Sequence, residues 1–207
     1  ASLELIASNV FNDFAIVTGG TAADTFVFQN NSTAKVVGVI DGGAGTNTLA
    51  GSVGVDSFGI TGSNIVGVTP SGGVSATNLT NITNIDGASA SDSGADVFTL
   101  NAGVNWSGSL NGTGGNDRFI FNNTSTIGGT LTGGTGSDTL NLSAYSAARN
   151  VTLNASSTGN GFAGTETSIS GGFSEINVLT LRNAVDDSLQ GANFTNTWVL
   201  SGSNSGS

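Results

Sequence analysis

The chain has 207 residues, including 33 glycines and one proline, and its four Lys and Arg residues leave a formal net charge of −10. So few basic residues exclude a nucleic-acid-binding surface, because phosphate neutralisation needs clustered Lys and Arg. The sequence also has no cysteine and no histidine, which removes disulfides, thiolate metal sites and the commonest general base. No apolar run approaches the roughly 20 residues of a membrane-spanning helix, so we expect no membrane insertion.

Short runs in which apolar and polar residues alternate recur along the chain, as expected of strands with one buried face. Most of them begin with an acid or an amide that is followed two residues later by a large apolar residue. In chain order these pairs are Asp24 and Phe26, Asn47 and Leu49, Asp56 and Phe58, Asp96 and Phe98, Asp117 and Phe119, and Asp138 and Leu140. The alternation predicts inward-facing side chains at Phe26, Phe28, Phe98, Leu100, Phe119, Phe121, Leu140 and Leu142.

A repeat of about 21 residues connects these runs. Asp96, Asp117 and Asp138 follow one another at equal steps, and Leu110 and Leu131 repeat the same step. One unit then holds two short strands and two Gly/Asn turns, and it is too short to bury its apolar face unless units stack on one another. The pattern predicts an all-β fold, a parallel β-solenoid (a right-handed β-helix or a flatter β-roll) with coils of about 21 residues. A β-sandwich is the structural alternative, although its strands would not need to recur at a constant interval along the sequence.

The repeat lapses in two stretches, residues 61–90 and 145–185, which resemble each other around Ile82 and Ile176. They suggest that coils of different lengths alternate. No linker or domain boundary stands out, so residues 1–207 are expected to form one segment. We expect this segment to be a piece of a longer repetitive protein.

The stretch GGTGSDTLNL, residues 133 to 142, contains a complete glycine–aspartate motif. Its Gly133, Gly134, Gly136, Asp138 and Leu140 match the calcium-binding nonapeptide GGxGxDxUx of RTX proteins. The stretch GGAGTNTLA matches it with Asn47 in place of the aspartate. In this motif and in its Gly/Asn/Asp/Thr-rich texture, the chain resembles the repetitive regions of large secreted bacterial adhesins, both RTX-type and filamentous-haemagglutinin-like.

The resemblance implies that Ca²⁺ is the cofactor and lies between stacked turns, because glycine carbonyls and aspartates supply the oxygen ligands that this cation prefers. The candidate ligands are Asp96, Asp117, Gly134, Gly136 and Asp138. The alternative is that each aspartate caps a turn by accepting backbone N–H hydrogen bonds, an ordinary role for Asp and Asn. The uncharged Asn47 favours this second interpretation.

The functional prediction is an extracellular structural or adhesion module without catalytic activity, secreted or held at a bacterial cell surface. It would be a stiff part of an adhesin, surface layer or filament that assembles end to end through exposed sheet edges. Its expected partners are neighbouring copies, flanking repeats or cell-surface carbohydrate, and not nucleic acid.

The alternative function is a β-helix polysaccharide-degrading enzyme or a carbohydrate-binding module. Hydrolysis or elimination on a sugar needs converging carboxylates or a base with basic groups. The candidates are Asp186 and Asp187 with Glu166, Glu175 or Arg182, although the two aspartates also fit one more acidic turn. Trp106 and Trp198 could be sugar platforms, but both are expected along strands, with at least one packed into the core.

Overall fold

The computed structural model describes residues 2–5, 16–28, 39–62, 65–69, 76–88, 91–156, 160–182 and 186–192, and the regular elements in these ranges are all β-strands. The strands form one sheet of twelve and one sheet of nine. In spatial order, the larger sheet holds β1 (Ser2–Leu5), β3 (Thr25–Phe28), β5 (Thr48–Ala50), β9 (Asn84–Asp86), β12 (Leu110–Asn111), β15 (Leu131–Thr132), β19 (Ile169–Ile176), β18 (Phe162–Glu166), β17 (Asn150–Ser156) and β21 (Ser188–Gln190). Its other two strands, β11 (Asn105–Trp106) and β14 (Thr126–Ile127), pair with each other, and β14 also pairs with β19.

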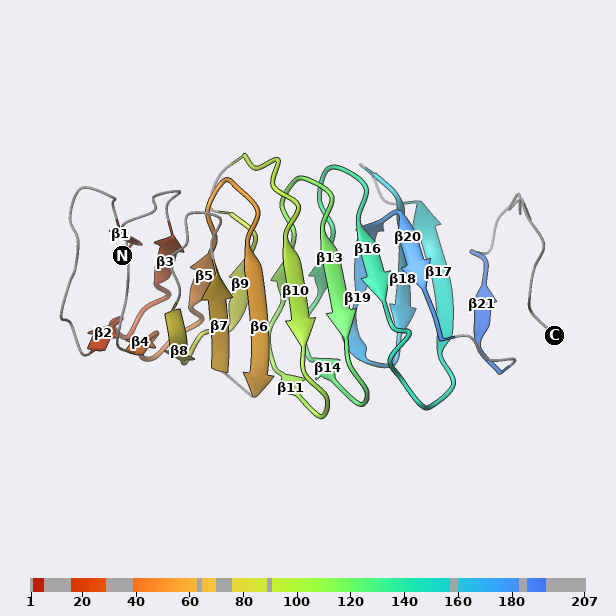
Figure 1. Ribbon diagram of the computed structural model, residues 1–207, viewed down its shortest axis with the longest axis horizontal. Coiled ribbons are helices and arrows are strands. Elements are labelled where there is room, and N and C mark those ends of the chain that lie inside the picture. Colours follow the sequence, from red (N-terminus) through yellow and green to blue (C-terminus); the bar gives the residue numbers. More distant parts are fainter. Residues whose placement is uncertain are drawn as a thin grey trace.

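The smaller sheet follows the same direction along the molecule (Figure 1). In spatial order it holds β2 (Ile16–Thr18), β4 (Val39–Asp41), β8 (Ala76–Thr80), β7 (Ile65–Thr69), β6 (Ser57–Gly62), β10 (Val97–Leu100), β13 (Arg118–Phe121), β16 (Thr139–Asn141) and β20 (Val178–Thr180). From β10 onward the chain passes back and forth between the two sheets, which lie one behind the other in Figure 1.

The repeat step of the sequence is the pairing register of neighbouring parallel strands. Phe98 pairs with Phe119 and Leu110 pairs with Leu131, so each residue meets its equivalent in the next repeat. Nearer the N-terminus the step is slightly longer, as in the pairing of Phe26 with Leu49. The expected all-β character with parallel pairing is therefore confirmed. One step of the repeat contains three strands, such as β10, β11 and β12, where the sequence pattern indicated two.

Both stretches in which the repeat lapses contain antiparallel strands. In the first, β7 pairs antiparallel with β6 and with β8, although residues 63–64, 70–75 and 89–90 of that stretch lie outside the described ranges. In the second, β18 pairs antiparallel with β17 and β19. The inserted strands lengthen the step between parallel partners, so that Phe58 pairs with Phe98 although β7, β8 and β9 lie between them in the chain.

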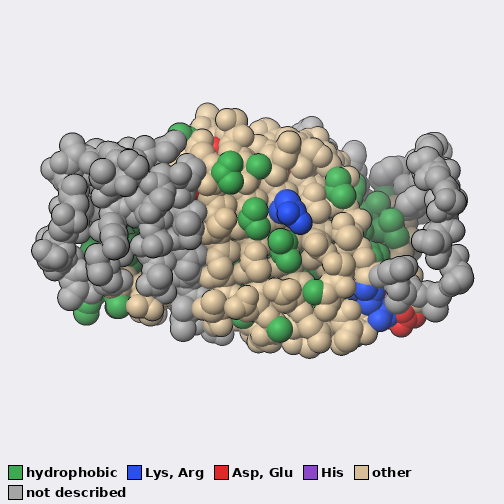
Figure 2. Space-filling view, in the orientation of Figure 1, with side chains coloured by type: hydrophobic (Ala, Val, Ile, Leu, Met, Phe, Trp, Pro, Cys, Tyr) green, Lys and Arg blue, Asp and Glu red, His purple; other side chains and the backbone are tan. Residues whose placement is uncertain are grey.

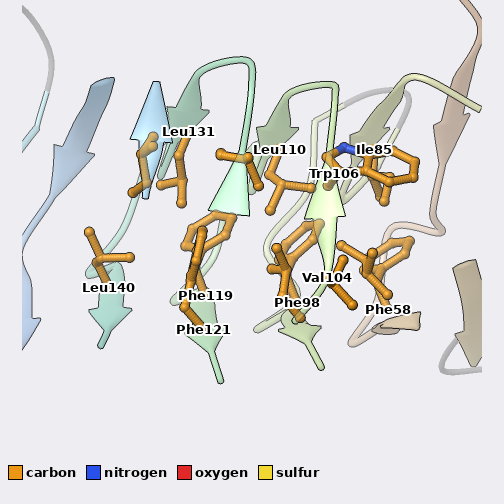
Figure 3. Packing of buried hydrophobic residues seen from close by; sticks show 14 of the residues in the cluster. Phe58, Ile85, Phe98, Val104, Trp106, Leu110, Phe119, Phe121, Leu131 and Leu140 are labelled. Carbon is orange, nitrogen blue, oxygen red and sulfur yellow. The ribbon is translucent and has the colours of Figure 1, made fainter. Parts of the chain in front are cut away.

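The core lies between the two sheets and consists of columns of like side chains. The rings of Phe58 and Phe98 stack with centroids 4.7 Å apart, and those of Phe98 and Phe119 stack at 4.8 Å. These distances equal the usual spacing of neighbouring strands, as parallel in-register pairing requires. Figure 3 shows this column beside Ile85, Leu110 and Leu131 of the other sheet. All eight side chains predicted to face inward are buried.

Trp106 is fully buried and belongs to this core, as expected of at least one tryptophan. Its parallel partner is Ile127, which in turn pairs with Ile169. Trp198 lies outside the described residues. The described part of the chain contains no helix with the length and apolar character needed to cross a membrane.

Candidate functional site

The acids and the amide that precede β6, β10, β13, β16 and β20 of the smaller sheet form a mostly buried line of hydrogen-bonded side chains, which we call the acid ladder. It consists of Asp56, Asp96, Asp117, Asp138 and Asn177. Each backbone N–H donates to the side-chain Oδ1 of the next member. The N–H to Oδ1 distances, in that order, are 2.7, 2.7, 2.8 and 2.9 Å. The ladder therefore joins strands that are paired in the sheet.

A glycine makes room for each aspartate of the ladder. A Cβ added to Gly112 would lie 2.2 Å from Oδ2 of Asp117, and one added to Gly133 would lie 2.7 Å from Oδ2 of Asp138. In both cases the glycine stands five residues before the aspartate. The first glycine of the GGxGxD motif is thus explained by the carboxyl group that lies against its α-carbon. The other two, Gly134 and Gly136, have φ angles of +100° and +127°, which favour glycine in the turn itself.

The middle of the acid ladder is an unusual electrostatic environment. Asp96, Asp117 and Asp138 are 0 % exposed, and Oδ2 of each has no hydrogen-bond partner. Burial raises the pKa of Asp96 to about 8 and that of Asp117 to about 7, and it also raises the pKa of Asp138. Two ionised carboxylates one strand apart, at about 4.8 Å, would repel each other by about 3 kcal/mol at an effective dielectric constant of about 20.

The structure brings the three aspartates of the calcium prediction into one line and places Gly134 and Gly136 in the turn before β16. In the described ranges no three or more Asp, Glu, His or Cys side chains are grouped so that they could hold a metal ion. Oδ1 of each aspartate already accepts a backbone N–H. These contacts assign the aspartates a hydrogen-bonding role, in which the bond joins neighbouring strands instead of closing the residue's own turn. The calcium site remains a prediction from the resemblance.

Three of the four acids considered for catalysis, Glu166, Asp186 and Asp187, take part in ion pairs. Arg182 contacts both Asp186 and Asp187, with 2.9 Å between its Nε and Oδ1 of Asp187. The same Oδ1 accepts the backbone N–H of Arg149 at 2.8 Å. Because this bond repeats the geometry of the acid ladder, Asp187 has the contacts of one more acidic turn.

Glu166 is buried and forms an ion pair with Arg149, with 3.3 Å between Oε1 and Nη1. Its Oε2 accepts the backbone N–H of Ser168 at 2.7 Å, and the guanidinium of Arg149 lies 4.2 Å from the ring centroid of Tyr145. Arg149 thus connects Glu166 to Asp187. Glu175 is apart from this group, because its carbonyl lies against Gly133 beside the acid ladder.

Two shallow hollows lie along the antiparallel strands β17, β18 and β19. One, of about 240 Å³, is lined by Thr130, Thr132, Thr165 and Ser174 together with glycines 164, 171 and 172. The other, of about 360 Å³, is lined by Asn150, Thr152, Thr165, Glu166, Thr167, Ile169 and Ser170. Hydroxyl and amide groups form about half of each lining, so both hollows could accept a polar uncharged ligand.

Asn177, the last member of the acid ladder, and Arg149, the partner of Glu166, are site residues that were not predicted from the sequence. The signal for Asn177 was present, since Leu179 follows it by two residues as in every other run. Arg149 carries no comparable local signal, because its partner is 17 positions away. Comparisons of the chain with protein-family models, with curated proteins and with solved structures find no match.

Proposed function

We propose that the chain is a β-solenoid module that serves as a stiff structural part of a secreted or cell-surface bacterial protein, such as an adhesin, surface layer or filament. The observation that carries this proposal is the continuous parallel register, in which Phe58, Phe98, Phe119 and Leu140 follow one another as strand partners. This column is uninterrupted from β6 to β16, and such continuous packing makes that part of the module stiff. Coils of about 21 residues belong to the same proposal.

Two further properties support a structural role. The described residues on the face in Figure 2 present mostly uncharged polar side chains and backbone, with scattered apolar and few charged groups. On the other sheet, polar side chains bond across neighbouring strands, as when the hydroxyl of Thr126 donates to Oδ1 of Asn105 at 2.9 Å. Such a surface keeps the module soluble and suits contacts with carbohydrate or with other copies.

The ends of the smaller sheet support assembly between copies. Its terminal strands are β2 and β20, and in the described residues each has a strand neighbour on one side only. Each also exposes a large apolar side chain, Ile16 at 59 % and Val178 at 44 %. Because an open sheet edge can pair with another strand, we propose that β20 of one copy meets β2 of the next.

The alternative, a carbohydrate-active enzyme or binding module, is favoured by the hollow that Glu166 lines together with threonine and serine hydroxyls. Against catalysis, Glu166 and Asp187 are engaged by Arg149 and Arg182 and by backbone N–H groups. Carboxylates held in this way serve the packing of the turns. The structural role is therefore the better-supported function.

Sedimentation velocity at increasing protein concentration tests the assembly. We expect the wild type to form larger species, Val178→Lys to stay monomeric, and Val53→Lys to behave as the wild type. Val53 is a matched control because it is 50 % exposed but lies between β5 and β6, away from the terminal strands. A wild type that stays monomeric, or equal behaviour of the two variants, would refute assembly through these ends. Depolymerisation of an acidic polysaccharide by the purified chain would refute the structural role.

A further inference from the structure

The two hollows of the larger sheet, of about 240 Å³ (the first hollow) and about 360 Å³ (the second hollow), adjoin each other on its outer face. Thr152 and Thr165 are strand partners, and Thr165 lines both hollows. Their chain neighbours Val151 and Glu166 are buried. Because side chains alternate between the two faces of a strand, Thr152 and Thr165 point away from the core.

An irregularity in β19 opens the first hollow. This strand pairs parallel with β15 at Phe173 and Ser174 and antiparallel with β18, and its register with β18 shifts on both sides of Gly164. Gly172 has a φ angle of +76°, a left-handed conformation that glycine adopts without strain. Such an irregularity bends a strand, and glycines 164, 171 and 172 put no side chain into the space that the bend leaves.

Several polar side chains in the hollows have no hydrogen-bond partner among the described residues. Elsewhere on the same sheet such groups bond to each other, as Thr126 does to Asn105. In the hollows, side-chain hydrogen bonds to the rest of the described chain are missing at Thr132, Asn154, Thr152, Thr165 and Ser174. A hydroxyl is both a donor and an acceptor, so these groups offer hydrogen bonds of both kinds to a ligand.

Neither hollow presents a charge. The described residues that line the first hollow include no Asp, Glu, Lys or Arg. Glu166 lines the second hollow, but its side chain is 0 % exposed and its Oε1 lies 3.3 Å from Nη1 of Arg149. The chain as a whole has a net charge of −10, which repels anionic ligands. The hollows therefore suit a neutral ligand.

The surroundings favour a sugar over a peptide. An extended peptide binds by adding a strand to a free sheet edge, whereas β15, β17, β18 and β19 each have strand neighbours on both sides. Apolar residues, among them Leu131, Ala163 and Phe173, form much of the remaining lining of the first hollow. A sugar ring has hydroxyls at its edge and C–H groups on its faces, so it matches a lining that is both polar and apolar.

We propose that the two hollows form one binding site for a neutral oligosaccharide. Sugar hydroxyls exchange hydrogen bonds with Thr132, Thr165 and Ser174, and a sugar ring packs against the apolar part of the first hollow. Because Thr165 lines both hollows, it lies between two consecutive sugar units. The site rests on the proposed function, since it gives a cell-surface module its contact with carbohydrate, and it involves no catalytic step.

Saturation-transfer difference NMR of the full chain tests this site. The probes are short oligomers of glucose, of mannose and of galactose, with oligogalacturonate as the charged comparison. We expect at least one neutral oligomer to bind and oligogalacturonate not to bind. Titration of the oligomer that binds gives the dissociation constant for the wild type and for each variant.

Two variants remove a hydroxyl from the site with little change of shape. Thr165→Val and Ser174→Ala should each weaken binding by about two- to tenfold, which corresponds to one hydrogen bond. Tm should stay unchanged, because Thr165 is exposed and valine suits a strand. Thr99→Val is the matched control, because Thr99 lies in β10 of the smaller sheet, and it should bind as the wild type does.

The site is refuted if no neutral oligomer binds or if oligogalacturonate binds as tightly. It is equally refuted if Thr165→Val and Ser174→Ala bind as tightly as Thr99→Val. Sedimentation velocity on the same samples separates this result from the proposed function. A wild type that assembles but binds no oligomer refutes the site alone, whereas one that binds and stays monomeric supports the site and refutes the assembly. Shortening of the bound oligomer would support the site and refute the structural role.

Discussion

Phe119 offers the sharpest test of the core. Its side chain is 0 % exposed and stacks on Phe98 with 4.8 Å between ring centroids, while Leu140 is its strand partner on the other side. Removing a buried Phe side chain costs about 3–5 kcal/mol, and losing a stacked aromatic pair adds about 0.5–1.5 kcal/mol. Phe119→Ala should therefore lower the free energy of unfolding by about 4–6 kcal/mol, which for a chain of this size lowers Tm on the order of 10–20 °C.

Urea unfolding followed by far-ultraviolet circular dichroism measures this loss. Phe119→Leu should cost only about 1 kcal/mol, because the new side chain keeps most of the volume and Leu140 already continues the column. Arg118→Ala, at the neighbouring exposed position, should change the stability by less than about 0.5 kcal/mol. Phe119→Asp should unfold the chain, because an unpaired charge would enter an apolar stack. The inward orientation of Phe119 would be refuted if Arg118→Ala and Phe119→Ala lowered the free energy of unfolding equally. A wild-type spectrum and Tm for Phe119→Asp would refute it as well.

The remaining predictions concern the turns, the buried ion pair and calcium. Gly112→Ala should cost about 1–3 kcal/mol in urea unfolding, because its Cβ would lie 2.2 Å from Oδ2 of Asp117; Gly20→Ala, whose Cβ would meet its nearest atom at 3.8 Å, should be tolerated. Glu166→Gln should cost about 3–5 kcal/mol, because it leaves the guanidinium of Arg149 buried without its counter-charge. If the aspartates act only through hydrogen bonds, Tm in chelator should equal Tm in millimolar calcium, and a marked rise with calcium would instead support the predicted metal site.

The all-β class and the buried side chains could be predicted from the sequence, because both depend on local patterns. Alternation with a period of two decides which face of a strand is apolar, and this assigned Phe98 and Phe119 to the core before any strand was paired. The repeat step also equals the pairing register of the parallel strands, because equivalent residues of successive repeats become strand partners. The two lapses in the repeat marked where antiparallel strands are inserted, but they did not indicate the direction of those strands.

The contacts of the candidate site were decided only by the tertiary structure. Oδ1 of Asp117 accepts its hydrogen bond from a residue 21 positions away, and Arg149 meets Asp187 across 38 positions. The motif around Asp138 was compatible with a calcium ligand and with a turn cap, because both use the same residue types. Stacking the strands buried each carboxyl against a glycine and a carbonyl and removed it from water, and no local pattern encodes that environment.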